Sequence, residues 1–420
     1  MSESLLPYHA LRSLTADGRL LFGTRCARMF AYGMLSVILV PYLQALGYLD
    51  RWGTIISAAL LGDIAVSLWI TTVADRVGRK RMLILGALLM IGAGLVFAAT
   101  DNFALLLIAA TIGVVSPSDK EVGPFLSIEQ SALSQTVPAR ERTGVFAWYN
   151  LAGSIAAALG ALAAGLVWKQ LLAAGRTGAD VYRPLVFAYA AIGLALAAAF
   201  LRLSPAAEAP PPADDHLPAP RSVGLNRSRS IVLRLSALFA LDAFGGGFIV
   251  QSVIVAWFLS RFDADPAVLG SMFFFANLLA AMSALVAARL AARFGLVNTM
   301  VFTHLPSNVL LIVVPLMPNL EWSIALLLLR YSISQMDVPT RQSYTMAVVH
   351  PDERSAAAGI TTVARSAGAA VSPYLAAKCL AIPALLGAPF YIAGAVKIIY
   401  DLWLYRAFVS QKTDEAGTRD

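Results

Sequence analysis

Twelve apolar segments, each long enough to cross a lipid bilayer, constrain the fold of this chain more than any other feature of its sequence. A transmembrane helix needs about 20 mainly apolar residues. The sequence meets this requirement at residues 20–47, 52–74, 82–100, 103–136, 143–168, 182–203, 231–260, 266–290, 297–317, 322–348, 356–380 and 384–409. Only 14% of the 420 residues are charged, whereas soluble domains average about 25%. So few charges cannot cover the surface of soluble domains of this total size, and the sequence therefore predicts an all-helical integral membrane protein.

A polar, proline-rich stretch at residues 204–230 separates the first six spans from the last six. Its composition is typical of a flexible linker, and we expect one six-helix half at 1–203 and another at 231–420. With both termini in the cytoplasm, 19 of the 32 Lys and Arg residues fall in cytoplasmic segments and six in outer loops. This bias sets membrane topology, and it explains the net charge of +7 without a nucleic-acid partner. We expect a multi-pass protein of the inner membrane without a cleavable signal peptide.

The two halves repeat each other at one constant offset in residue number. This offset aligns Glu141-Arg142 with Glu353-Arg354, Gln130-Ser131 with Gln342-Ser343, and the small residues of Ala156-x-x-x-Gly160 with those of Gly368-x-x-x-Ser372. Small residues at this spacing let two helices approach closely. A duplicated six-helix unit is one way in which secondary transporters build a binding site at the membrane midplane.

The fourth span is too long for one straight helix. Residues 116–124 carry two prolines and three charged side chains in its middle. A helix broken inside a membrane is tolerated where protein or a water-filled cavity covers the freed backbone groups. We therefore expect a break in the helix at this position.

The loop after the second span reads Ala74-Asp75-Arg76-Val77-Gly78-Arg79-Lys80-Arg81. It resembles the signature loop of the major facilitator superfamily, Gly-x-x-x-Asp-Arg-x-Gly-Arg-Lys, and lies where that family has it. The second half has a degenerate copy at residues 288–295. The sequence departs from the family pattern at Thr71, which replaces a glycine, and at Gly160-Ala161, which replaces the Gly-Pro pair of many antiporters. The resemblance implies a monomeric secondary transporter with twelve helices in two pseudo-symmetric halves.

The same resemblance assigns Asp75, Arg76, Gly78 and Arg79 to gating at the cytoplasmic ends of the two halves. Gly78 permits a tight turn, and Asp75 can accept hydrogen bonds from the start of a helix or from an arginine. The alternative is that these charges only set the topology.

Charged residues inside the spans are costly, so they line a cavity or pair with each other. Helical spacing places one set on a single face of the first span (Arg25, Arg28, Tyr32, Ser36) and another on a single face of the tenth (Arg330, Ser334, Asp337, Arg341). A guanidinium offers a planar fork to a carboxylate or phosphate. The candidates for binding an anionic solute are therefore Arg28, Tyr32, Arg341 and Arg365. The alternative is that each arginine neutralises a neighbouring acid.

Four acidic residues in the spans are candidates for proton coupling: Asp242, Asp337, Asp63 and Glu129. Asp337 shares its helix face with two arginines, so a static ion pair is the alternative, whereas Asp242 has no evident partner on its own helix. For Asp63 the alternative is a structural hydrogen bond. Glu129 occupies the repeat position of Arg341, where it forms either a bridge between the halves or a solvated helix end.

Three further polar residues in the spans receive no functional assignment. Lys397 and Asp401 are four residues apart on the last span, which is typical of a local structural pair. His304 is isolated in the sequence and indicates no metal site.

The sequence contains no phosphate-binding glycine loop, no nucleophile–base motif and no cluster of metal ligands. We therefore expect neither an enzyme nor a cofactor. The leading interpretation is a proton-coupled secondary transporter of a small anionic or amphiphilic solute, with antiport in the efflux direction favoured. An uptake symporter or uncoupled facilitator for an organic anion is one alternative. A membrane sensor or assembly factor that does not transport is another.

Overall fold

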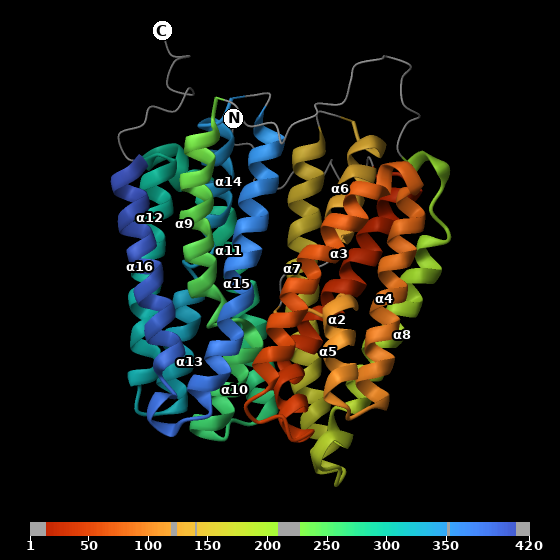
Figure 1. Cartoon of the computed structure of the whole chain (residues 1–420), viewed down its shortest axis with the longest axis vertical. Coiled ribbons are helices and arrows are strands. Elements are labelled where there is room, and N and C mark those ends of the chain that lie inside the picture. The colour runs from red at the N-terminus through yellow and green to blue at the C-terminus, as the bar shows by residue number, and fades with distance from the viewer. Residues whose placement is uncertain (1–13, 119–123, 139–140, 209–226, 351–352, 409–420) are drawn as a thin grey trace. The chain divides into compact units, whose positions relative to one another are not determined.

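The computed structural model of the chain describes residues 14–118, 124–138, 141–208, 227–350 and 353–408, apart from the side chains of Asp75, Thr143, Ala288 and Ser355. These described residues form α-helices, short 3-10 turns and connecting loops, and they contain no strand. The prediction of an all-helical fold is therefore confirmed (Figure 1).

The helices follow the predicted spans in chain order. The first six spans contain α2 (Ala16–Ala45), α3 (Trp52–Val77), α4 (Arg79–Ala99), α5 (Phe103–Ile112), α6 (Phe125–Thr136), α7 (Arg142–Ala173) and α8 (Arg183–Phe200). The last six contain α9 (Arg229–Gly247), α10 (Gln251–Phe262), α11 (Pro266–Phe294), α12 (Leu296–Val313), α13 (Leu320–Tyr331), α14 (Asp337–Ala347), α15 (Arg354–Leu380) and α16 (Ala388–Phe408). The fourth, seventh and tenth spans are each divided into two helices.

The predicted break in the fourth span lies between α5 and α6, and its three charged residues, Asp119, Lys120 and Glu121, lie outside the described residues. Among the described residues, nine stretches are long and apolar enough to cross a membrane. The other three predicted spans are the broken fourth and tenth spans and α15. These three spans are interrupted or more polar than the other nine.

The chain divides into two compact units. Unit 1 comprises residues 1–211 and 250–278, and unit 2 comprises residues 212–249 and 279–420. One boundary between them falls in the gap between α9 and α10. Because α10 and the first part of α11 belong to unit 1, the compact units differ from the six-helix halves predicted from the linker. The division of the chain into two repeated halves stays a prediction.

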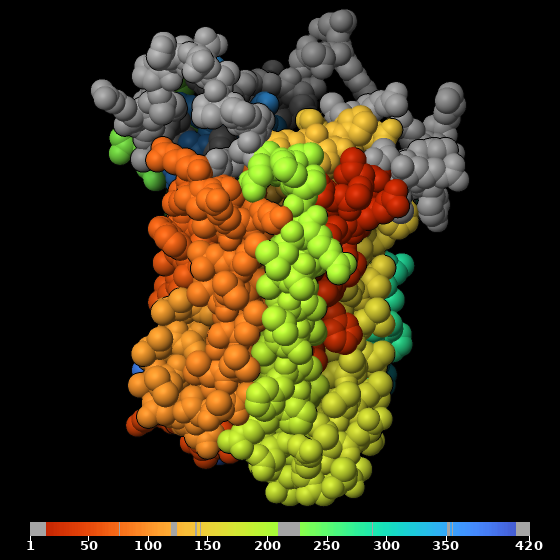
Figure 2. All heavy atoms as spheres, turned by 90° about the vertical axis from the view of Figure 1, so that its right-hand side faces the viewer, coloured from red at the N-terminus to blue at the C-terminus, as the bar shows by residue number. Residues whose placement is uncertain are grey.

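The same pairs of helices pack together in each unit. The first and fifth spans, α2 and α7, are in contact in unit 1, as are the equivalent α9 and α15 in unit 2. The third and sixth spans, α4 and α8, are also paired, as are the equivalent α12 and α16. Figure 2 shows α8 lying along α4 on one face of unit 1. Most of α2 is buried, because it packs against several helices of this unit.

Small residues mark the closest approach between α2 and α7 and between α9 and α15. A Cβ on Gly160 would lie 2.0 Å from the carbonyl oxygen of Phe30, and one on Gly368 would lie 2.2 Å from that of Ala240. Real Cβ atoms do not approach backbone so closely, so these helix pairs require glycine. The predicted role of these small residues in helix packing is confirmed.

We expect Gly160→Ala to lower the free energy of unfolding by about 1–3 kcal/mol, because the added methyl group forces α2 and α7 apart. Gly92→Ala is the matched control, since a Cβ on Gly92 meets nothing within 4 Å. The measurement is denaturant unfolding of the purified protein in detergent. Equal stability of the two variants would contradict the packing argument.

Candidate functional site

The repeat predicts where the helices begin. Helix α6 starts at Phe125 and α14 at Asp337, and α7 starts at Arg142 and α15 at Arg354, in each case with the constant offset of the repeat. The first span of each half follows a slightly larger offset. Gly160 meets the carbonyl of Phe30, and the equivalent residue Ser372 donates a hydrogen bond of 2.5 Å to the carbonyl of Phe244. Phe30 and Phe244 are two positions further apart in the sequence than Gly160 and Ser372.

These two offsets relate a buried ion pair in unit 1 to one in unit 2. Arg28 on α2 is equivalent to Asp242 on α9, and Glu129 on α6 is equivalent to Arg341 on α14. Arg28 pairs with Glu129, and Asp242 pairs with Arg341. In unit 1 the cation lies on the first span and the acid on the fourth. In unit 2 the acid lies on the equivalent first span and the cation on the equivalent fourth.

The pair in unit 1 is fully buried. Arg28 and Glu129 both have side chains with 0% exposure. The guanidinium donates two parallel hydrogen bonds of 2.8 and 2.7 Å to the two oxygens of Glu129. The same carboxylate accepts from Thr24 at 3.1 Å and from the hydroxyl of Tyr149. A bidentate pair with both oxygens satisfied is among the strongest side-chain interactions in proteins.

The other polar residues of this helix face are also held within unit 1. Arg25 donates to the amide oxygen of Asn150 at 3.2 Å, and its guanidinium carbon lies 4.2 Å from the centre of the Tyr149 ring. Tyr32 is fully buried. Glu129 pairs with Arg28 of its own unit and is buried, so the expectation of a solvated helix end is wrong. The geometry favours the alternative that Arg28 neutralises a neighbouring acid.

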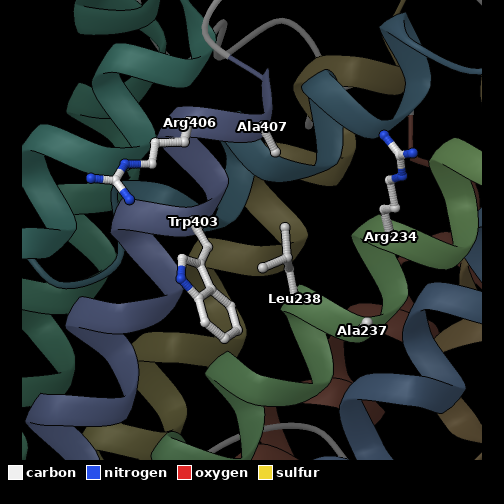
Figure 3. Close-up of a pocket in the computed structure, with 6 residues that line it drawn as sticks. All are labelled: Arg234, Ala237, Leu238, Trp403, Arg406 and Ala407. Carbon is white, nitrogen blue, oxygen red and sulfur yellow. The ribbon is translucent and has the colours of Figure 1, made fainter.

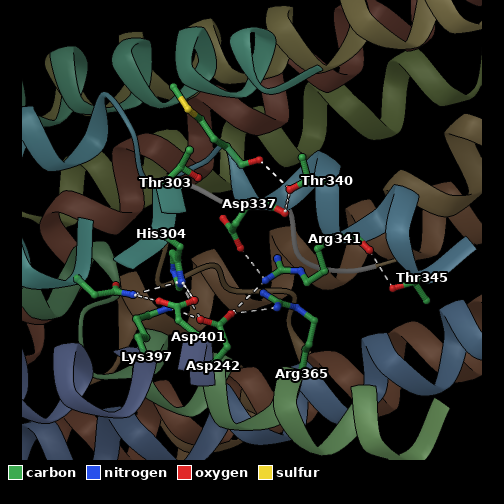
Figure 4. A network of polar contacts seen from close by, with 12 residues as sticks. Asp242, Thr303, His304, Asp337, Thr340, Arg341, Thr345, Arg365, Lys397 and Asp401 are labelled. Atoms are coloured by element: carbon green, nitrogen blue, oxygen red, sulfur yellow. Dashed lines mark hydrogen bonds and ion pairs between the residues drawn. The ribbon is translucent and has the colours of Figure 1, made fainter. Parts of the chain in front are cut away.

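Asp242 in unit 2 is the centre of a larger network (Figure 4). Its Oδ1 accepts from Lys397 at 2.5 Å. Its Oδ2 accepts from Arg341 and from Arg365, each at 3.2 Å. His304 Nε2 lies 3.8 Å from Oδ1. The four neighbours come from α16, α14, α15 and α12, so one carboxylate on α9 contacts four other helices.

Asp337 extends the network along α14. Its Oδ2 accepts from Arg341 at 2.8 Å, through the same nitrogen that contacts Asp242. Both carboxylates are nine-tenths or more buried, and Arg341 is shared between them. This is the ion pair that the helical spacing allowed as an alternative to proton coupling.

His304 connects Asp242 to a second carboxylate. Its Nδ1 lies 2.8 Å from Asp401 Oδ1, and Asn308 donates to Asp401 Oδ2 at 3.0 Å. A carboxylate only accepts, so this contact requires the proton of the imidazole on Nδ1. Nε2 then lies on the side of Asp242, which makes His304 a bridge between two acids.

The sequence interpretation missed this part of the site. Lys397 and Asp401 do not form the expected local pair, because Lys397 contacts Asp242 and Asp401 contacts His304. All the partners are buried. The signal available in the sequence was a pair of polar residues on one face of each helix. His304 and Asn308 are four residues apart on α12, and Lys397 and Asp401 are four residues apart on α16.

The remaining candidate residues lie apart from these networks. Asp63 is half-buried and accepts from Ser67 at 3.0 Å on its own helix, as the structural alternative predicts. The side chain of Asp75 lies outside the described residues, and Arg76 is exposed.

Gly78 joins α3 to α4 with φ of 114°, a conformation that favours glycine. The first backbone N–H groups of α4, at Arg79 and Lys80, donate to the carboxylate of Glu208 at 2.6 and 3.3 Å. Glu208 therefore caps the helix that follows the signature loop, a role not predicted from the sequence. The equivalent Gly295, with φ of 84°, joins α11 to α12. The gating role of Asp75, Arg76, Gly78 and Arg79 stays a prediction.

An open groove of about 430 Å³ lies between α9 and α16 of unit 2. Figure 3 shows Trp403 and Leu238 beside each other in it, with Arg234 and Arg406 on opposite sides. None of its lining residues belongs to the Asp242 network. In the part of the chain that the structure describes, no group of three or more His, Cys, Asp or Glu side chains could hold a metal ion.

The family model described as the Major Facilitator Superfamily matches residues 21–373. The chain belongs to this superfamily. Its membership establishes a multi-pass membrane transporter rather than an enzyme, as the signature loop and the repeat predict. The buried charges of units 1 and 2 thus lie in the helices of a solute transporter.

Three further comparisons agree with this assignment. The transporter is 30% identical to the membrane protein YJR124C of Saccharomyces cerevisiae, over 422 residues and 94% of each chain. It is similar to the crystal structure of a D-xylose-proton symporter, with a TM-score of 0.69, 12% identity and coverage of 92% of this chain and 97% of the other. It is also similar to that of the human organic anion transporter MFSD10, with a TM-score of 0.60, 18% identity and coverage of 93% and 100%. The two structural likenesses show the fold.

We expect Arg28→Met to destabilise the transporter by about 3–5 kcal/mol, because Glu129 would remain buried without its counter-charge. Removing both charges in Arg28→Met/Glu129→Leu should restore most of the stability. Denaturant unfolding in detergent measures both variants, with Arg81→Met as the control because Arg81 is exposed. Full stability of the single variant would show that the pair contributes nothing to the fold.

Proposed function

We propose that this transporter is coupled to protons and that Asp242 is the carboxylate that couples them. The observation that carries the proposal is the convergence of three cations and one histidine, from four helices, on this single buried side chain. In this proposal the protein works as a monomer in the inner membrane with both termini in the cytoplasm, as the charge bias of its loops favours.

Neutralising Asp242 changes the forces between helices. Arg341 and Arg365 each lie 3.2 Å from the same oxygen, and Lys397 lies 2.5 Å from the other. A proton on Asp242 removes the negative charge that holds these three cations together. Like charges at short range in a medium of low dielectric constant repel strongly. Protonation therefore favours a different arrangement of α9, α14, α15 and α16, which is what coupling to alternating access requires.

His304 is suited to deliver the proton. Its Nδ1 is held by Asp401, so the ring orientation is fixed and Nε2 is directed toward Asp242. Histidine changes charge within the physiological pH range more readily than any other side chain. We assign His304 as the group that exchanges a proton with Asp242, and Asp401 as the group that orients it.

Arg365 is the network member best placed to contact a solute. Its side chain is 30% exposed, whereas those of Asp242, Arg341 and Lys397 are between 4% and 8% exposed. A solute that binds Arg365 weakens its bond to Asp242 and so affects the proton. Tyr32, Asp63, Asp337 and Glu129 remain lesser candidates for binding or coupling, and Arg28 is assigned to the fold.

We expect Asp242→Asn to abolish proton coupling, because an amide cannot exchange a proton at this position. Wild-type protein is reconstituted into liposomes loaded with a pH-sensitive dye. The lumenal pH is then followed after addition of D-xylose, benzenesulfonate or tetraphenylphosphonium, which represent a sugar, an organic anion and a lipophilic cation. At least one solute should change the lumenal pH, and the sign of the change distinguishes symport from antiport.

Asp101→Asn is the control for this experiment, because Asp101 is an exposed carboxylate paired with Arg183 in unit 1. It should transport like the wild type. A pH change that persists in Asp242→Asn would refute the proposed coupling role.

We expect His304→Gln to slow proton-coupled flux at least about tenfold while leaving solute exchange without a pH gradient intact. The glutamine amide can replace the hydrogen bond to Asp401, but it cannot carry a proton. The two rates are measured in the same proteoliposomes, with and without an imposed gradient. Equal loss of both rates would indicate a structural role for His304 instead.

A further inference from the structure

Arg330, at the end of α13, is a buried cation outside the Asp242 network. The residue is 6% exposed, and its Nε has no hydrogen-bond partner. Its guanidinium carbon lies 5.2 Å from the centre of the Tyr331 ring. No ion pair of Arg330 with a carboxylate occurs among the described residues, in contrast to Arg28, Arg341 and Arg365.

The carboxylates of the Asp242 network already have cationic partners other than Arg330. The three carboxylates Asp242, Asp337 and Asp401 are matched in number by Arg341, Arg365 and Lys397. Glu353, a further buried carboxylate of unit 2, accepts from the backbone N–H groups of Arg227 and Ser228. Arg330 is thus left without an ion-pair partner among the described residues. An uncompensated charge inside a membrane protein is costly, so a counter-ion at this position stabilises the transporter.

The break in the tenth span places a second unsatisfied polar group near this cation in the chain. Residues 332–336 are turns between α13 and α14. Within them Ser334 is 4% exposed, and its hydroxyl has no hydrogen-bond partner. The backbone N–H of Gln335 donates to Ser283 of α11 at 3.3 Å, which fixes this part of the break. The Nε of Arg330 and the hydroxyl of Ser334 are thus two buried donors that lack an acceptor among the described residues.

We propose that Arg330 and Ser334 bind the anionic head group of the transported solute. The inference rests on the proposed transport function, and it names the solute class as small organic anions. A guanidinium donates to two oxygens of a carboxylate, sulfonate or phosphate, and a serine hydroxyl adds a third donor. Bound here, the anion supplies a counter-charge to Arg330.

Electrostatic attraction links the anion to the proton. A proton taken up by His304 or Asp242 adds one more positive charge to unit 2, which strengthens the attraction for an anion in a medium of low dielectric constant. Anion and proton then bind together and move in the same direction. This mechanism favours a symporter over the antiporter preferred from the sequence.

The test is isothermal titration calorimetry of the purified full-length protein in detergent, with sodium benzenesulfonate as the probe. Benzenesulfonate stays charged at every working pH, and benzenesulfonamide is its uncharged analogue. We expect the wild type to bind the sulfonate and not the sulfonamide. Arg330→Gln should weaken binding by about 10- to 100-fold, because it removes a charge-assisted pair of hydrogen bonds. Arg330→Lys should retain part of the affinity.

Two further variants keep the test independent of folding. Ser334→Ala removes only a hydroxyl and should weaken binding by about three- to tenfold. Arg25→Gln is the matched control, because Arg25 is an arginine of unit 1 with the same 6% exposure, and it should bind like the wild type. An effect of Arg25→Gln as large as that of Arg330→Gln would overturn the assignment.

Other outcomes also contradict the proposal. No sulfonate binding by the wild type, or sulfonate affinity unchanged in Arg330→Gln, would exclude this site. Equally tight binding of sodium chloride would show a site for inorganic anions instead. Calorimetry needs neither a membrane nor a gradient. Anion binding at Arg330 can therefore be observed even if proton-coupled flux is absent, and proton-coupled flux can be observed even if Arg330 binds no anion.

Discussion

The cost of placing a charge in a membrane interior governs how unit 2 is built. An ionised side chain is stable there only when opposite charges and hydrogen bonds surround it. Asp242 meets this requirement with Lys397, Arg341 and Arg365, each from a different helix. Because every partner must reach the same carboxylate, the rotation of α14, α15 and α16 about their axes is fixed by this contact. Any event that changes the charge on Asp242 therefore acts on several helices at once.

Equivalent positions in the two repeats carry side chains of opposite charge and have different surroundings. In unit 1 the pair of Arg28 and Glu129 is bidentate, and Glu129 also accepts from Thr24 and Tyr149. In unit 2 the equivalent pair of Asp242 and Arg341 is shared with further cations and acids. A bidentate buried pair resists separation, because both charges would be left buried without a partner. A shared pair can exchange one partner for another at lower cost, since alternatives lie within reach. On this argument the buried pair of unit 1 is more resistant to change than that of unit 2.

Sequence reasoning predicted the features that follow from local pattern. Apolar runs predicted the helices, and the constant offset between the repeats predicted that Glu129 and Arg341 occupy equivalent places. The partners of these residues could not be predicted, because the choice of partner depends on how helices far apart in sequence are oriented. His304 was missed for the same reason, since its two carboxylates lie on α9 and α16. The break at 332–336 was also missed, because it contains neither proline nor glycine.

The fourth span of each half is broken at an equivalent level, before α6 in unit 1 and before α14 in unit 2. A broken helix exposes backbone donors and acceptors that require polar surroundings. The same surroundings lower the cost of a buried charge, so charged side chains and helix breaks are expected together. In the first half the position equivalent to Arg330 is Ser118, which carries no charge. A cation at this repeat position therefore occurs in the second half and not in the first. Under the proposed mechanism, an anion bound there would give Arg330 a counter-charge in the same unit as the Asp242 network.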